Sequence, residues 1–438
     1  MKARLIPLYF QSADDPEFRG QCEKLEELLR EEADILEPRP LGSTLPEADA
    51  VIFPQVLGDA YRRVEEIRAI PVPIIIATSE FGMVNMWDWE IVNYLRGRGI
   101  QVFAPYTLDL TRSIVRACAL RKEMKETSFL LFQDNPGEGM QASIFKRFFW
   151  WEQECIERVR QKFGVQAVKK SFKALGEKAK SISDEKAREV WARWNWPTEG
   201  LSESAILSAV KIYLVLKEEV EDIPSVKGAG MNCLNESFYS DTTPCLAWCM
   251  LFAEKELIWA CEGDLMTLLT KFILYRTLRQ PVMMSNVYPF LMGQAALKHE
   301  RIAKFPEVTE PENHLLIAHC GYFGLMPPAF ASNWVVRPKV LAIVDENAHA
   351  VDARFPEGPV TLAKLDSTLE KIFLVEGILE GYAQYPGSDC RNGGIIRISS
   401  GRRLMAHLPS HHMLILTGHH GVALENVAKV LDVAVEEL

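Results

Sequence analysis

The stretch LIWACEGDLMTLLTKFILYRTL, residues 257–278, decides the fold of this chain. It begins with a short apolar strand, passes through the two carboxylates Glu262 and Asp264, and ends in an apolar helix over 265–278. Continuous apolar strands that alternate with helices are typical of parallel sheets covered on both faces. We therefore predict that this stretch closes an α/β unit, with ligands expected beyond the carboxyl end of its strand.

The same alternation of apolar runs and helical segments extends back to the start of the chain. One series of runs lies at 4–10, 48–56, 72–79 and 100–104, and a second series begins at 128–132. This pattern predicts two doubly wound α/β domains, over residues 1–126 and 127–285. No GxGxxG motif follows the first strand, so a nucleotide-dependent enzyme is not indicated.

The pattern changes after Pro281, where short β-like runs are separated by Gly/Pro turns such as PEGP at 356–359. Such runs predict an antiparallel, barrel-like β domain over residues 286–438. An amphipathic helix is expected at its end, over 422–436. The predicted fold class is therefore α/β, with two N-terminal doubly wound domains followed by an antiparallel β-rich C-terminal domain.

Composition and charge exclude several classes of protein. The 438 residues include 49 Lys and Arg against 59 Asp and Glu, which gives a net charge of −10 and argues against a nucleic-acid partner. No apolar run approaches the ~18–20 residues of a membrane span. The start MKARLIPLYF has no cleavage site behind it, and nine scattered cysteines are typical of reduced thiols. A cytoplasmic protein without a membrane partner is expected.

Two groups of residues are candidates for a functional site. All nine histidines lie between positions 299 and 420, with local groupings in SHH at 410–412, GHH at 418–420 and AHCG at 318–321. Imidazole is a frequent metal ligand and acid/base group. The second group is Glu262 and Asp264, which open a helix whose N-terminus favours negative charge. A plain helix cap is the alternative interpretation of either carboxylate.

Taken together, these motifs resemble the L-fucose isomerase and L-arabinose isomerase family. The resemblance rests on CEGD at a strand end, a short strand at 282–287, the apolar His319-Cys320, and the late motif HHx5GHxG that starts at His411. Enzymes of that family have two N-terminal α/β domains followed by a β-rich domain, the order predicted above. In architecture the resemblance covers nearly the whole chain, whereas the motifs all lie after residue 257.

The resemblance implies a divalent metal, most often Mn²⁺, held by a glutamate, an acidic residue on the next strand and a late histidine. Glu262 matches the first position and His412 the third, but the second falls on Asn286. Hard divalent cations prefer carboxylate oxygens, so the site is altered at this position. The family also implies a monosaccharide partner and a homo-oligomer, either a trimer or a hexamer.

Family chemistry would be the interconversion of an aldose and a ketose through an enediol, with the metal as a Lewis acid. One carboxylate moves the proton and a second commonly assists, which makes Glu262 and Asp264 the catalytic candidates. Three functions stay open on this scaffold: isomerisation, other metal-dependent sugar chemistry such as epimerisation or a retro-aldol step, and carbohydrate binding without catalysis.

Four further residues are candidate substrate contacts, each with an ordinary structural alternative. His319 ends an apolar strand, and His411 precedes the ligand candidate; either could instead be a satisfied structural imidazole. Arg391 follows a turn and could equally be a solvated loop residue, whereas Trp87 opens a helix and could be core packing. His349 and His407 have no partner in sequence and are expected at the surface.

Overall fold

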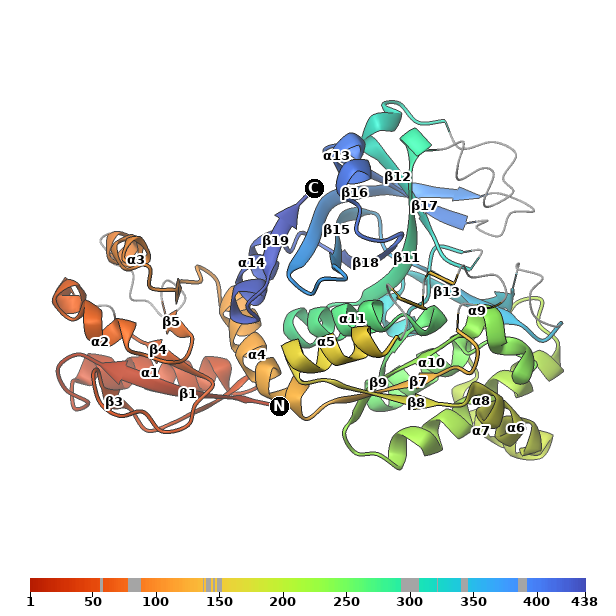
Figure 1. The fold of residues 1–438 in the computed structure, drawn as a ribbon, viewed down its shortest axis with the longest axis horizontal. Helices are drawn as coiled ribbons and strands as arrows, with labels where there is room; N and C mark the ends of the chain where they lie inside the picture. The colour runs from red at the N-terminus through yellow and green to blue at the C-terminus, as the bar shows by residue number, and fades with distance from the viewer. Residues whose placement is uncertain are drawn as a thin grey trace. The chain divides into compact units, whose positions relative to one another are not determined.

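A computed structural model describes residues 1–55, 58–77, 88–136, 138, 143–144, 146–147, 152–292, 307–320, 322–339, 346–384 and 392–438. Two parallel α/β sheets are followed by an antiparallel β-barrel, so the predicted fold class is confirmed (Figure 1). Among these residues, no helix is both long and apolar enough to cross a membrane.

The first sheet is parallel, with the strand order β2-β1-β4-β5-β6, and β3 pairs with β1. Its strands form where apolar runs occur; all four residues of AVIF in β4 are buried. Helix α1 begins where Asp15 accepts hydrogen bonds from the backbone N–H groups of Glu17 and Phe18. The elements are β1 (Ala3–Tyr9), α1 (Pro16–Leu29), β2 (Ala33–Ile35), β3 (Arg39–Pro40), β4 (Ala50–Phe53), α2 (Val64–Arg68), β5 (Ile74–Ile76), α3 (Asp88–Gly97), β6 (Val102–Phe103) and α4 (Leu108–Lys125).

The second sheet is also parallel, with the order β10-β9-β7-β8. Glycine allows β9 to pack closely, because a Cβ atom on Gly228 would lie 2.9 Å from the Phe129 ring. The elements are β7 (Ser128–Phe132), α5 (Gln153–Phe163), β8 (Gln166–Lys170), α6 (Phe172–Ser181), α7 (Asp184–Trp194), α8 (Glu203–Glu221), β9 (Val226–Met231), α9 (Cys233–Glu236), α10 (Cys245–Lys255), β10 (Ile258–Ala260) and α11 (Leu265–Leu278). Residues 257–278 thus form β10, a tight turn and α11.

The third sheet is a barrel, because the path β15-β18-β11-β12-β17-β16 is closed by pairing of β15 with β16. Strand β11 lies between β12 and β18, and Asn286 is opposite both Ala318 and His412. The elements are β11 (Val282–Pro289), β12 (His314–Ala318), β15 (Gly358–Leu365), β16 (Lys371–Gln384), β17 (Asn392–Ile398), α13 (Gly401–His407) and β18 (His412–Thr417), with a separate pair β13 (Asn333–Pro338) and β14 (His349–Arg354).

The end of the chain differs from the prediction. The helix expected over 422–436 is α14 (Gly421–Val430), and a short strand, β19 (Ala434–Glu437), follows it. Asp432 has a φ of 55°, a left-handed conformation that a continuing helix does not tolerate. The last residues then pair with β16 as a parallel strand, from Ala434 opposite Lys371.

Packing divides the chain into two compact units. The first consists of Met1–Met124, Arg276–Leu278 and Val422–Val433, and the second of Lys125–Tyr275, Arg279–Gly421 and Ala434–Leu438. The second sheet and the barrel therefore belong to one unit, and the three-domain division of the chain stays a prediction.

Helix α11 buries a lysine that forms no ion pair with any described residue. Lys271 is almost fully buried, and its Nζ atom lies 3.2 Å from the centroid of the Trp259 ring. Within the described residues, this ammonium group has no hydrogen-bond partner. Burial lowers the pKa of Lys271 to about 7, against a smaller opposing effect of the Cys261 and Cys249 thiols.

We expect Lys271→Met to stabilise the protein near pH 7. Between pH 7 and 10.5 the unfolded chain binds this proton more tightly than the folded chain, so wild-type stability rises with pH across that window. The variant should gain roughly 2–4 kcal/mol in the free energy of unfolding near pH 7, and the gain should shrink towards pH 10. Urea unfolding at both pH values measures this, with the exposed Lys186→Met as the control. A variant less stable than wild type at neutral pH would contradict the prediction.

Candidate functional site

The candidate site is built around a strained turn at the carboxyl end of β10. Residues Cys261–Gly263 form one short 3-10 turn, in which Glu262 has a φ of 59° and Gly263 a φ of 69°. The turn packs closely on β9, since a Cβ atom on Gly230 would lie 3.3 Å from the Cα atom of Gly263. Left-handed backbone at a non-glycine residue is costly and gathers at functional sites. Glu262 is held there with its carboxylate buried.

Asp264, two residues later, is fully buried and bonded to several donors. It caps α11 by accepting from the Thr267 backbone N–H at 2.8 Å, and it also accepts from the Thr267 hydroxyl at 2.6 Å. Lys364 Nζ lies 3.3 Å away, and His412 Nδ1 lies 2.9 Å away. Burial opposes a charge here, but Lys364, His412 and Thr267 hold the pKa of Asp264 well below its usual range. The carboxylate is therefore both the helix cap and a partner of the candidate ligand.

His412 is oriented by two carboxylates. Because Asp264 accepts at Nδ1, that nitrogen carries a proton, and Nε2 lies 3.6 Å from Glu262 Oε1. Burial disfavours the imidazolium, yet the Glu262 and Asp264 carboxylates raise the pKa of His412 to about 9. In return, His412 lowers the pKa of Glu262 to about 2 in spite of its burial. A carboxylate that fixes one nitrogen of a histidine while the other faces the site is the arrangement found around histidine metal ligands.

The pairing of β11 with β18 places Asn286 next to His412. Its position on β11, opposite His412 on β18, puts the two side chains on the same face of the barrel wall. The Nδ2 atom donates to the Tyr288 hydroxyl at 3.1 Å. The Oδ1 atom is buried and has no hydrogen-bond partner in the described part of the chain. A buried acceptor without a partner calls for an explanation, and a bound ligand supplies one.

His319 is a second buried polar side chain whose lack of a hydrogen-bond partner in the described residues calls for an explanation. It follows β12 directly, is buried, and has no hydrogen-bond partner at either ring nitrogen among the residues that the structure describes. Its ring centroid lies 6.2 Å from that of His412, with the rings almost perpendicular. Burial lowers the pKa of His319 to about 4, so the imidazole is neutral at pH 7. A neutral imidazole offers one donor and one acceptor, the pair that a sugar hydroxyl can use.

His411 also reaches the site, although neighbours along a strand point to opposite faces. Strand β18 begins only at His412, so that alternation does not apply to His411. The ring centroids of His411 and His412 are 4.0 Å apart. Burial lowers the pKa of His411 to about 3. Trp87 and Arg391, the other two predicted substrate contacts, lie outside the described residues.

The two histidines predicted at the surface, His349 and His407, differ in burial. His407 is half exposed, as expected, and pairs with Glu436 at 3.2 Å. The prediction for His349 was wrong, because this side chain is buried. Helix α10 has no side-chain cap, and His349 Nε2 accepts the Leu246 backbone N–H at 2.9 Å in its place. Its role is therefore structural.

Sequence reasoning missed Lys364, which is completely buried on β15 and holds Asp264. Burial lowers the pKa of this lysine, while Asp264 opposes that effect. A lysine inside the apolar run VTLAKL at 360–365 was the available signal. Its partner could not be found in that way, because Asp264 is 100 residues earlier in the chain.

A divalent cation needs several oxygen or nitrogen ligands that converge on one point. Across the described ranges, no group of three His, Cys, Asp or Glu side chains is arranged to hold a metal ion. Glu262 and His412 supply two such donors, and the third would be the amide oxygen Asn286 Oδ1, to which no described residue donates a hydrogen bond. This candidate set would offer a divalent metal one nitrogen, one carboxylate and one neutral oxygen, where the family that the sequence resembles has a second carboxylate.

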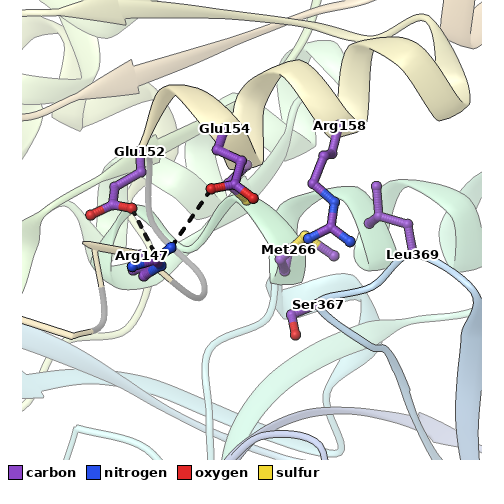
Figure 2. A pocket seen from close by; sticks show the side chains of 8 residues that line it. Arg147, Glu152, Glu154, Arg158, Met266, Ser367 and Leu369 are labelled. Atoms are coloured by element: carbon purple, nitrogen blue, oxygen red, sulfur yellow. Dashed lines mark ion pairs between the residues drawn. The ribbon is translucent and has the colours of Figure 1, made fainter.

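A separate cavity of about 130 Å³ lies near the first turns of α5 and α11 (Figure 2). Arg147 forms ion pairs there with Glu152 at 3.9 Å and with Glu154 at 3.8 Å, so the charges on its wall offset one another. The lining residues are Arg147, Glu152, Glu154, Cys155, Arg158, Met266, Ser367 and Leu369. We assign no function to this cavity.

Comparison with known proteins adds no relative: neither the family models nor the curated proteins that were searched match this chain. The function has to be argued from the site itself.

Proposed function

We propose that this protein is a metal-dependent sugar isomerase that interconverts an aldose and a ketose. One observation carries the proposal: Asp264 holds His412 Nδ1 at 2.9 Å, which leaves Nε2 facing the Glu262 carboxylate at 3.6 Å. Asn286, whose side-chain oxygen has no hydrogen-bond partner among the described residues, lies on β11 opposite His412 on β18. Glu262, Asn286 and His412 would hold the metal, Mn²⁺ by the sequence resemblance. When bound, the metal would supply Lewis-acid polarisation of the sugar oxygens.

The two carboxylates take different roles in this proposal. Asp264 accepts from the Thr267 N–H, the Thr267 hydroxyl, Lys364 and His412, and these contacts suit it to position His412. Glu262 is ionised at neutral pH and borders the proposed substrate space, so it is the better placed carboxylate to take and return the C2 proton. Asp264, a catalytic candidate from sequence, is proposed here as a positioning residue.

His319 and His411 would bind and orient the sugar. Both are neutral at pH 7 and lie close to His412, so each can donate to one hydroxyl oxygen or accept from one hydroxyl proton. Their burial also keeps water away from the reacting carbons. A homo-oligomeric state, a trimer or hexamer, and a cytoplasmic location belong to the same proposal.

A second candidate function is carbohydrate binding without turnover. The observation that favours it is the amide at position 286, because the described residues then offer the proposed site two ionisable donors, Glu262 and His412, and no third. Epimerisation or a retro-aldol step could use the same residues. Metal content separates a binding protein from all the enzymes, and exchange of the C2 proton separates an isomerase from a retro-aldol enzyme.

The deciding experiment is metal analysis of the purified protein, followed by proton exchange at C2 of candidate aldoses in deuterium oxide. We expect about one divalent ion per chain and deuterium at C2 in at least one aldose. A protein that binds sugar but retains no metal after dialysis against Mn²⁺ would replace isomerisation with the binding function.

Asn286→Asp should tighten Mn²⁺ binding. The change restores a carboxylate oxygen at the position that now offers a neutral amide, and hard cations bind charged oxygen more strongly. We expect an increase of about 10-fold or more in affinity by calorimetry. Asn333→Asp, an exposed change at the first residue of β13, is the matched control. Weaker binding in Asn286→Asp would mean that the amide group itself is needed, for example as a donor to the substrate.

His319→Ala should weaken sugar binding and leave the metal in place. The imidazole has two buried nitrogens that no described residue satisfies, so in this proposal its removal deletes a substrate contact at little cost to the fold. We expect a loss of about 10-fold in sugar affinity, with unchanged metal content. Loss of the metal in this variant would make His319 a metal ligand, whereas wild-type sugar affinity would make its role structural.

A further inference from the structure

Gln133 is a buried amide that takes no part in the contacts around Glu262 and His412. It is the residue after β7, and only 4% of it is exposed. Neither its Nε2 nor its Oε1 atom has a hydrogen-bond partner among the residues that the structure describes. The amide offers two N–H donors and an acceptor oxygen, and burial of such groups without partners is costly. The side chain is therefore available to a polar ligand.

Gln133 lies at the carboxyl edge of the second sheet, at a point where the topology favours ligand binding. From β7 the chain passes to β8 on one side and later to β9 on the other, so the strand order reverses between β7 and β9 (Figure 1). Ligands of open parallel sheets bind beyond the carboxyl ends of the strands at such a point. The ends of β7 and β9 stay adjacent here, because the Asn232 N–H donates to the Phe132 carbonyl at 3.0 Å.

The side chain of Gln133 belongs to the face of the sheet that carries the acidic turn. A Cβ atom on Gly230 of β9 would lie 3.4 Å from Leu131 Cδ2 and 3.3 Å from Gly263 Cα, so Leu131 and the turn are on the same face. Side chains two residues apart on a strand share a face. The Gln133 N–H donates to the Lys170 carbonyl at 3.0 Å and so continues the ladder between β7 and β8. The alternation therefore extends to Gln133.

Strand register sets the span between Gln133 and Glu262. Leu131, Gly230 and Ala260 lie opposite one another on β7, β9 and β10. Gln133 and Glu262 each come two residues later, so they leave the sheet at the same level. Two strand spacings separate β7 from β10, which is about 10 Å. An open-chain pentose or hexose spans such a distance when one end is held near Glu262 and the other hydrogen-bonds to Gln133.

The loop that begins at Gln133 is held in place by hydrogen bonds. The Asp134 N–H donates to the buried Glu236 carboxylate at 2.9 Å, and the Asp134 side chain accepts from the Lys173 N–H at 2.8 Å. A polar group that is fixed before binding loses little conformational entropy when the ligand arrives. This placement suits a residue that distinguishes between similar ligands.

We infer that Gln133 selects the sugar by hydrogen-bonding two neighbouring hydroxyl groups at the end of its chain remote from C1 and C2. The inference rests on the proposed function, because it takes the C1–C2 end of the sugar to lie at Glu262. One hydroxyl group accepts from Nε2 and its neighbour donates to Oε1, so both amide atoms gain a partner. A sugar without these hydroxyl groups leaves the buried amide unpaired and is rejected. Gln133 is thus a specificity residue that does not touch the reacting carbons.

The test measures the binding of sugar alcohols, which have no carbonyl group to isomerise, to the full-length protein with Mn²⁺ present. Ribitol, arabinitol, xylitol, sorbitol, mannitol and galactitol are long enough to reach Gln133, whereas erythritol and threitol are too short. Gln133→Met keeps the length of the side chain and removes its donors and acceptor. Gln166→Met, an exposed change at the first residue of β8, is the matched control.

We expect Gln133→Met to weaken binding of the tightest long sugar alcohol by about 10-fold or more in calorimetry. Mn²⁺ affinity and the binding of erythritol and threitol should stay as in the wild-type protein, and Gln166→Met should change nothing. Wild-type affinity for the long sugar alcohols in Gln133→Met, or an equal loss for long and short ones, overturns the inference.

Stability supplies a second measurement that does not depend on sugar binding. Because the amide has no partner among the described residues, its replacement by an apolar side chain should leave the midpoint of urea unfolding no lower than in the wild-type protein. A large decrease in Gln133→Met would show that the amide supports the fold, and it would overturn the inference even if that variant could not be titrated.

The wild-type titrations separate this inference from the proposed function. A protein that binds Mn²⁺ but none of the long sugar alcohols overturns the role of Gln133 and leaves the metal site intact. A protein that binds neither overturns the proposed function, and the inference falls with it. Loss of Mn²⁺ binding in Gln133→Met would place this residue at the metal site and not at the remote end of the sugar.

Discussion

Glu262→Gln and His412→Ala should each abolish tight Mn²⁺ binding while the protein stays folded. Glu262 carries the only negative charge in the proposed ligand set, and Gln keeps its size without that charge. His412 supplies the single nitrogen donor, already turned towards Glu262 by its bond to Asp264. Removal of a direct ligand should cost more than the 10–100-fold typical of residues that only orient one. Isothermal calorimetry with Mn²⁺ measures the loss, and unfolding curves show that the fold persists.

The controls for these variants change the same residue types away from the site. Glu370→Gln is an exposed carboxylate change in the same unit, and His407→Ala removes a half-exposed imidazole. Both should bind Mn²⁺ like the wild-type protein. If Glu262→Gln and His412→Ala also retain full metal occupancy, the metal lies elsewhere and the site assignment is wrong.

The fold could be predicted from sequence because each type of sheet has its own local pattern. The continuous run SFLLF of β7 is buried on both faces of a parallel sheet, and the run is visible in the sequence without knowledge of its neighbours. The end of the chain could not be predicted in this way. The residues of β19 continue the helical pattern of α14, and only their pairing with β16 makes them a strand.

The candidate site was predictable in part. Residues that lie close together in the sequence could be identified, whereas contacts between residues far apart in the sequence could not. The succession of strand, acidic turn and helix at 257–278 marked Glu262 and Asp264. The helix cap and a functional role appeared as alternatives for Asp264, whereas in the structure the same carboxylate caps α11 and holds His412. Contacts that join residues 148 positions apart depend on barrel closure, which local patterns do not contain.

Lys364→Met should destabilise the protein strongly, by roughly 3–5 kcal/mol, because it removes the lysine cation from the buried Asp264 carboxylate and leaves His412 as its remaining cationic neighbour in the described residues. Both side chains have no exposed surface, and the Lys364 Nζ atom lies 3.3 Å from Asp264 Oδ2. Lys371→Met, which breaks the partly exposed pair with Glu436 on the neighbouring strand, is the matched control and should cost about 0–1 kcal/mol. Urea unfolding of both variants measures the difference.

The double variant Asp264→Asn/Lys364→Met decides whether the loss comes from the Asp264 charge that Lys364 no longer balances. With both charges removed, the free energy of unfolding should recover to well above the sum of the two single losses, since neither partner is left charged in the interior. Mn²⁺ affinity should not recover with it, because the neutral amide introduced by Asp264→Asn would be a weaker acceptor for His412 Nδ1 than the carboxylate that now fixes the ring. Additive losses of stability would show that the Asp264 charge does not depend on Lys364. Full metal affinity in the double variant would show that Asp264 does not position His412.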